Sequence, residues 1–199
     1  NSIAILLLMF YFDSWNNLIA WIYLALHGTY GYLWILKSRI FPDKQWENKT
    51  NLSYGLLIWV GLSLYWISPY IIISGNRILP FSIPMYPIYI FFCLTIYILG
   101  IFFHFTSDMQ KHTQLKYKKG NLIDNGMFKS LRNTNYLGEL FIYLGFSLLA
   151  LDWTPLLALL CFVFIIWIPN MYKKDKSLAK YPDFKKYKSN TKKFIPFIW

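Results

Sequence analysis

The sequence predicts an all-α membrane protein, a polytopic helix bundle of five or six spans with a basic C-terminal tail. Of its 199 residues, 56% are hydrophobic and 21% are aromatic, and the mean hydropathy is +0.36. A soluble domain of this length could not bury so much apolar surface. The apolar residues also gather in runs close to the roughly 20 residues that an α-helix needs to cross a bilayer.

The first four apolar runs are 3–12, 18–36, 52–73 and 84–105. The run at 3–12 is short and suits either the end of a first span or a re-entrant segment. Pro69 predicts a kink in the third span, because proline inside a helix removes a backbone hydrogen bond. Pro84 and Pro87 lie in the first turn of the fourth span, where proline is tolerated.

Two shorter runs, 135–151 and 155–171, predict a helical hairpin in which each helix reaches about 25 Å. The turn between them contains Asp152, which we expect to be exposed and without a functional role. Thr154 followed by Pro155 is typical of a helix start, with a capping hydroxyl and proline at the first position.

Basic residues gather in alternate loops. The basic segments are 37–50, 106–133 and 172–199, and the segments between them are 13–17, 74–83 and 152–154. Arg77 is the only basic residue in the second group. Because loops on the cytosolic side are enriched in Lys and Arg, we expect the basic loops and the tail on the cytosolic or matrix side. We expect the tail to bind anionic membrane lipids and not nucleic acid.

The sequence lacks the motifs of several common catalytic, cofactor and metal sites. Cys93 and Cys161 both lie in apolar runs and are too few for a disulfide framework or a zinc site, so we expect both in the core. We find no glycine-rich dinucleotide fingerprint, no Ser-His-Asp series and no metal-ligand cluster, and therefore predict no metal.

Polar residues inside the spans mark a candidate site. Asn135 and Glu139 are four residues apart, as are His104 and Asp108, so each pair occupies one helix face. Both pairs lie at the basic-side ends of their helices and are expected to converge. Glu139 could hold a ligand or form a structural salt bridge, since acids inside membrane helices are held by partners. His104 is better explained as a hydrogen-bonded core histidine.

Three motifs resemble the C-terminal domain of the steroid 5-alpha-reductase family: SD at 107–108, GMF at 126–128 and LRNTNYLGE at 131–139. The tail continues the likeness with KYP at 180–182 and FIPFIW at 194–199. The resemblance covers residues 98–199 well. It is weaker over the N-terminal membrane helices of residues 1–97, where HGTYGY at 27–32 is similar to a helix of that family.

The resemblance implies an integral-membrane enzyme, in the endoplasmic reticulum, that uses NADPH to reduce a carbon–carbon double bond of a steroid or other lipid enone. The resemblance also implies that Asn135 and Glu139 bind the nicotinamide end of NADPH and that Asp108 binds its adenosine side. Arg132 matches a further basic position of the family. His104 stands where the family usually has asparagine, and is included among the cofactor-binding candidates. Tyr30 and Glu139 are the candidate catalytic residues, Tyr30 by its location alone, as with Tyr23 and Tyr32.

Two other hypotheses stay open. Asn133-Thr134 replaces the family's usual His-Pro or Asn-Pro, and the loop between Asp108 and Phe128 lacks its arginines. These differences favour an accessory subunit of a multi-subunit membrane complex, such as a respiratory assembly of the mitochondrial inner membrane. The third hypothesis is a lipid or isoprenylcysteine methyltransferase, because those membrane enzymes share the superfamily shape.

Overall fold

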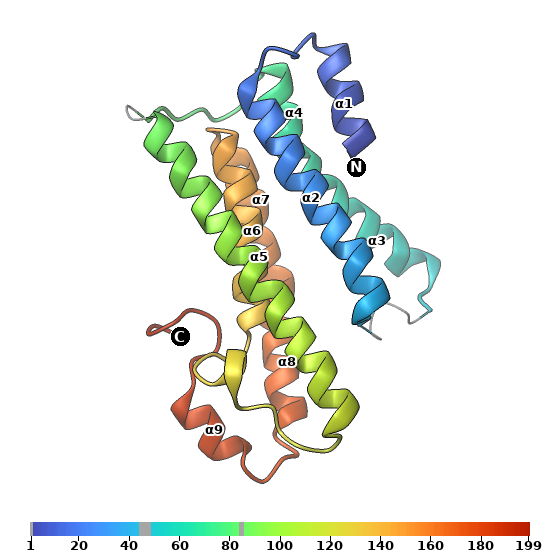
Figure 1. Ribbon diagram of the computed structural model, residues 1–199, viewed down its shortest axis with the longest axis vertical. Coiled ribbons are helices and arrows are strands. Elements are labelled where there is room, and N and C mark those ends of the chain that lie inside the picture. The colour runs from blue at the N-terminus through green and yellow to red at the C-terminus, as the bar shows by residue number, and fades with distance from the viewer. Residues whose placement is uncertain (1, 44–48, 84–85) are drawn as a thin grey trace. The chain divides into compact units, whose positions relative to one another are not determined.

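The computed structural model describes residues 2–43, 49–83 and 86–199, and within these ranges the regular structure is helical, with only two isolated β-bridges (Figure 1). The all-α prediction is confirmed for this part of the chain. The helices are α1 (Ser2–Tyr11), α2 (Leu18–Ile40), α3 (Leu52–Ser63), η2 (Leu64–Trp66), α4 (Ile67–Ser74), α5 (Tyr86–Tyr117), η3 (Gly126–Phe128), α6 (Thr134–Leu149), α7 (Trp153–Phe162), η4 (Val163–Trp167), α8 (Ile168–Leu178) and α9 (Phe184–Asn190).

Four helical segments are long and apolar enough to cross a membrane: Leu18–Ile40, Gly55–Ser74, Tyr86–Tyr117 and Trp153–Leu178. The protein is therefore an integral membrane protein. Helix α1 has 10 residues and α6 has 16, so both are shorter than these four. A total of five or six spans, and the side on which the tail lies, stay predictions.

Two prolines change the helical geometry one turn before their own position. Proline removes one backbone hydrogen bond and its ring crowds the carbonyl four residues earlier. The residue four before Pro69 is Tyr65, which lies in the 3₁₀ turn η2. The residue four before Pro169 is Ile165, which lies in the π-helical segment η4. The helix is thus irregular beside Pro69, where we predicted a kink, and Pro169 accompanies a second irregularity.

Helix α5 is longer than its apolar run. It continues through a segment that we predicted as loop and ends at Tyr117, after 32 residues. That corresponds to about 48 Å, whereas the hydrocarbon layer is about 30 Å thick. The extra turns contain Gln110 and Gln114, which form helix readily in water. The predicted start at Pro84 lies outside the described residues.

The turn between α6 and α7 corrects two expectations. Asp152 is fully buried, and its carboxylate accepts hydrogen bonds from the backbone N–H groups of Ile78 (2.7 Å), Leu79 (2.9 Å) and Thr154 (2.8 Å). Burial alone would raise the pKa of Asp152, but these hydrogen bonds outweigh it and lower the pKa below its ordinary value. The cap of α7 is therefore the Asp152 carboxylate and not the Thr154 hydroxyl.

The two cysteines differ in environment. Cys93 is buried, as expected, whereas Cys161 is exposed. Cys161 follows Leu160, which is also exposed, so this part of α7 faces away from the core. The expectation of a buried Cys161 was wrong because apolar residues on a membrane helix can face lipid as readily as protein.

The chain divides into two compact units. The first contains residues 1–96 and 143–159, and the second contains residues 97–142 and 160–199. In the first unit, α1, α2 and α4 pack together. The Asn17 side chain begins α2 by accepting from the N–H of Ile19, and it donates to the carbonyl of Ile72. This single residue therefore ties the start of α2 to α4.

Candidate functional site

In the second unit, two glycines bring α5 and α6 into backbone contact. A Cβ atom on Gly100 would lie 2.6 Å from the backbone N of Ile142, and one on Gly138 would lie 2.4 Å from the backbone N of His104. Only glycine fits at such distances. Small residues allow this kind of close helix approach in membranes. The contact places His104 directly against the first turns of α6.

His104 lies between two carboxylates. Its Nε2 atom is 3.7 Å from Asp108 Oδ2, and its Nδ1 atom is 3.8 Å from Glu139 Oε1 and 3.4 Å from the backbone carbonyl oxygen of Asn135. The ring is almost completely buried. We call His104, Asp108, Asn135 and Glu139 the histidine–carboxylate cluster. The structure thus brings together the two pairs that helix periodicity placed on α5 and α6.

Two acceptors of the histidine–carboxylate cluster could meet a ligand. The Glu139 side chain is 21% exposed, whereas that of Asp108 is 8% exposed. The Oδ1 atom of Asn135 is buried and has no hydrogen-bond partner within the described part of the chain. A buried acceptor without a donor destabilises the protein by about 1–3 kcal/mol. A ligand carrying N–H groups would offset that penalty.

A side-chain network holds the loop that leads to this cluster. The Gln110 amide donates to the backbone carbonyl of Asn125 (2.9 Å) and accepts from the N–H of Met127 (2.8 Å). Gly126 has a φ of 54°, and a Cβ there would lie 2.6 Å from Gln110 Oε1. Thr134 Oγ1 donates to the Met127 carbonyl. The sequence singled out Gly126 and Met127 by resemblance but gave no signal for Gln110.

Arg132 has a different environment from the one expected of a cofactor ligand. Its guanidinium forms a two-point pair with Asp175, at 3.2 Å from Nε and 3.3 Å from Nη2. Nη1 donates to the Thr191 carbonyl (2.6 Å) and hydroxyl (2.9 Å). Lys193 Nζ lies 3.6 Å from Asp175 and 3.2 Å from the ring centre of Tyr172. We call Arg132, Asp175, Thr191 and Lys193 the tail cluster.

Lys174 on α8 lies close to both clusters. Its Nζ donates to the backbone carbonyl of Arg132 at 2.9 Å. It also interacts electrostatically with Asp108 and Lys111 on α5. Nothing local in the sequence predicted that Lys174 would lie close to both clusters.

Tyr30 belongs to the first unit, whereas Glu139 belongs to the second. Tyr30 is buried, and its hydroxyl lies 3.4 Å from that of Tyr143. Tyr143 in turn stacks on Tyr65, with ring centres 4.5 Å apart. Tyr23 is buried against Phe146, whereas Tyr32 is 69% exposed. Of the three candidate tyrosines, Tyr30 has a hydroxyl partner in Tyr143 and lies in an aromatic cluster.

Residues 43–191, well over half of the chain, match the protein family described as "Protein of unknown function (DUF1295)". The chain belongs to the DUF1295 family. The matched segment contains the whole histidine–carboxylate cluster and Arg132, and it begins after Tyr30. No curated protein and no solved structure matched the chain.

Proposed function

We propose that this DUF1295 protein is an integral-membrane, NADPH-dependent ene reductase that acts on a steroid-like or other lipid enone. The histidine–carboxylate cluster would receive the amide end of the cofactor. The observation that carries the proposal is the buried Oδ1 atom of Asn135, which has no donor within the described ranges, one helical turn from the partly exposed Glu139. The LRNTNYLGE motif at 131–139 supports the same assignment.

The residues fit one end of the cofactor well. A primary carboxamide has two N–H donors, and both the Asn135 amide oxygen and the Glu139 carboxylate are acceptors. Because these side chains are four residues apart on α6, they can bind one planar group from the same side. NADPH bound there would supply a hydride to the activated double bond. In this arrangement, Asn135 and Glu139 orient the group that carries the hydride.

His104 is proposed as a positioning residue. It is buried between Asp108 and Glu139, and a bound molecule would contact the Glu139 side chain more readily than the imidazole. The contact with His104 restricts the orientation of the Glu139 carboxylate. This role combines the two interpretations of His104, because a core histidine can act on a ligand through its neighbour.

Arg132 does not fit the cofactor, since its guanidinium is bound to Asp175 and Thr191. The phosphates would instead be met by lysines of the basic face. Lys111 and Lys174 are the best candidates, since Lys174 interacts with both Lys111 and Asp108. A lysine ammonium binds phosphate as a point charge, without the bidentate geometry of arginine.

Tyr30, which lies in the first unit, stays the candidate catalytic tyrosine. A phenol next to a second hydroxyl can give up a proton while it keeps a hydrogen bond, and Tyr143 supplies that hydroxyl. We expect Tyr30→Phe to reduce turnover while leaving NADPH affinity unchanged. Equal turnover in that variant would remove Tyr30 from the mechanism.

The decisive experiment is the variant Glu139→Gln. We expect NADPH affinity to fall about 10- to 100-fold, since a charge-assisted hydrogen bond of about 1.5–3 kcal/mol is lost, and enone reduction to be abolished. Tryptophan-to-NADPH energy transfer and NADPH oxidation in detergent measure the two effects. Asp183→Asn, which removes one exposed carboxylate, is the matched control. Wild-type binding and turnover in Glu139→Gln would refute the proposal.

A second candidate function is an accessory subunit of a membrane assembly. The buried use of Arg132 and the many exposed aromatic side chains, such as Trp59 and Phe164, favour it. Large exposed aromatic groups are typical of surfaces that meet lipid or a partner subunit. Purification in complex with other subunits, without NADPH binding, would favour this function, whereas an active isolated monomer would exclude it.

A further inference from the structure

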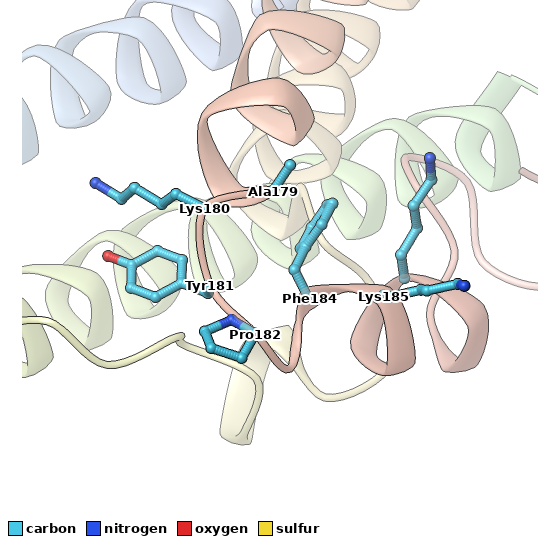
Figure 2. A pocket seen from close by; sticks show the side chains of 7 residues that line it. Ala179, Lys180, Tyr181, Pro182, Phe184 and Lys185 are labelled. Carbon is cyan, nitrogen blue, oxygen red and sulfur yellow. The ribbon is translucent and has the colours of Figure 1, made fainter.

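A hollow of about 390 Å³ opens between the end of α8 and the start of α9 (Figure 2). The residues that line it are Ala179, Lys180, Tyr181, Pro182, Phe184, Lys185 and Lys188. Ala179, Pro182 and the buried Phe184 form its apolar part. Lys180 and Lys185 lie on opposite sides of Phe184 in Figure 2. The hollow therefore combines an apolar centre with cationic edges.

The backbone around the hollow is fixed by several hydrogen bonds. The N–H of Tyr181 donates to the Leu178 carbonyl, and the N–H of Phe184 donates to the Tyr181 carbonyl, each at 3.0 Å. The carbonyl of Lys188 accepts from Arg132 Nη1 at 3.2 Å. The hollow is therefore part of the folded second unit and is held by the tail cluster.

The positive charge around the hollow favours an anionic ligand. Three lysines and no acidic residue line it. Lys180 Nζ lies 5.2 Å from the ring centre of Tyr181, which keeps this ammonium at the edge of the hollow. Lysine side chains carry a charge at the end of a flexible apolar stem, so the stems can cover an apolar group while the ammonium groups reach an anionic one.

The position of the hollow favours a ligand at the membrane surface. The last segment able to cross a membrane ends at Leu178, and the first lining residue is Ala179. The charged residues Lys173, Lys174, Asp175 and Lys176 precede Ala179, so the hollow lies beyond the hydrocarbon layer, on its aqueous side. Basic residues close to the membrane surface attract anionic lipids.

We propose that this hollow is a binding site for the headgroup of an anionic phospholipid, with Lys180, Lys185 and Lys188 at its cationic edges and Phe184 against the glycerol region. The separation of Lys180 and Lys185 by an apolar centre favours a lipid over a free phosphate ion, which would be bound by convergent donors. The site is independent of the proposed reductase activity and applies equally to a subunit of an assembly.

The test is the triple variant Lys180→Gln, Lys185→Gln and Lys188→Gln of the full chain in detergent. Native mass spectrometry would measure binding of dioleoyl phosphatidylglycerol and dioleoyl phosphatidylcholine. We expect wild type to prefer phosphatidylglycerol and the variant to bind it at least about tenfold more weakly, because each lysine near the surface contributes several-fold. Ala179→Phe, which fills the hollow without changing the charge, should give a similar loss.

The matched control is Lys116→Gln, Lys118→Gln and Lys119→Gln at the end of α5. These lysines are also exposed, and Lys116 lies 5.2 Å from the Tyr117 ring centre, as Lys180 does from Tyr181. We expect the control to keep phosphatidylglycerol binding within about twofold. Equal loss in the control, no loss in Ala179→Phe, or displacement of the lipid by millimolar inorganic phosphate would overturn the proposal.

Discussion

The second unit contains two groups of charged residues that differ in the lengths of their polar contacts. In the tail cluster, Arg132 donates to Asp175, Thr191 and the Lys188 carbonyl at 2.6–3.3 Å. In the histidine–carboxylate cluster, the two His104–carboxylate distances are 3.7 and 3.8 Å. The tail cluster is therefore built of short hydrogen bonds, and the other of longer electrostatic contacts.

The acidic side chains of the two clusters also differ in their exposed fraction. The Asp175 side chain is 8% exposed and lies near two cations, whereas the Glu139 side chain is 21% exposed. Buried charges contribute to a stable structure only when their hydrogen bonds are complete. The comparison indicates that the tail cluster stabilises the fold, whereas the ligand site proposed for the histidine–carboxylate cluster rests on the partly exposed Glu139 and on the Oδ1 atom of Asn135.

The largest expected effect is on stability, from Arg132→Ala. Removal of the guanidinium leaves the Asp175 carboxylate buried without its main partner, and such losses are about 3–5 kcal/mol. Thermal unfolding in detergent should show a strongly lowered midpoint. Arg132→Lys should give an intermediate result, because it keeps the charge and loses the two-point geometry. An unchanged midpoint in Arg132→Ala would show that the tail cluster is not the stabilising group.

Gly138→Ala tests the contact that brings His104 to Glu139. Its Cβ would lie 2.4 Å from the His104 backbone N, so α5 and α6 must separate, and we expect a loss of about 1–3 kcal/mol. The control is Gly31→Ala on α2, where a Cβ meets nothing within 4 Å. Because alanine favours helix over glycine, the control should be neutral or slightly stabilising. Equal unfolding midpoints for the two variants would contradict the close helix contact.

The sequence predicted most helices because the bilayer imposes long apolar runs, and helix periodicity placed His104 with Asp108 and Asn135 with Glu139. It did not predict the end of α5, since polar helix-forming residues outside the hydrocarbon layer resemble a loop. Nor did it predict the partners of Arg132, because Asp175 lies 43 residues away along the chain. Asp152 was misjudged for the same reason, since its partners Ile78 and Leu79 lie 74 and 73 residues away.

Asp152 provides a buried carboxylate in the first unit for comparison with the buried Asp175 and the partly exposed Glu139. Its pKa is lowered in the folded protein, so its contribution to stability is present above the ordinary carboxyl pKa of about 4 and is lost as the pH falls through the lower folded-state value. We expect Asp152→Asn to lose about 1–2 kcal/mol at pH 7. Below about pH 4 the difference from wild type should shrink. A constant difference from pH 7 to pH 3 would exclude this carboxylate as the source.

The smallest expected effect is that of Asn135→Leu, which is compared with a substitution two residues earlier, at Asn133. The Oδ1 atoms of Asn133 and Asn135 are both buried without a hydrogen-bond partner among the described residues, but Asn133 Nδ2 donates to the Lys193 carbonyl at 2.8 Å. Asn133→Leu leaves a buried carbonyl without its donor and should lower stability by about 1–3 kcal/mol. Asn135→Leu, of similar volume, removes an acceptor that has no donor, so stability should change by less than about 0.5 kcal/mol or rise. Urea-induced unfolding in detergent would measure both changes. If Asn135→Leu destabilised the protein as much as Asn133→Leu, Asn135 would be a structural residue like Arg132, and the contrast between the two clusters would be lost.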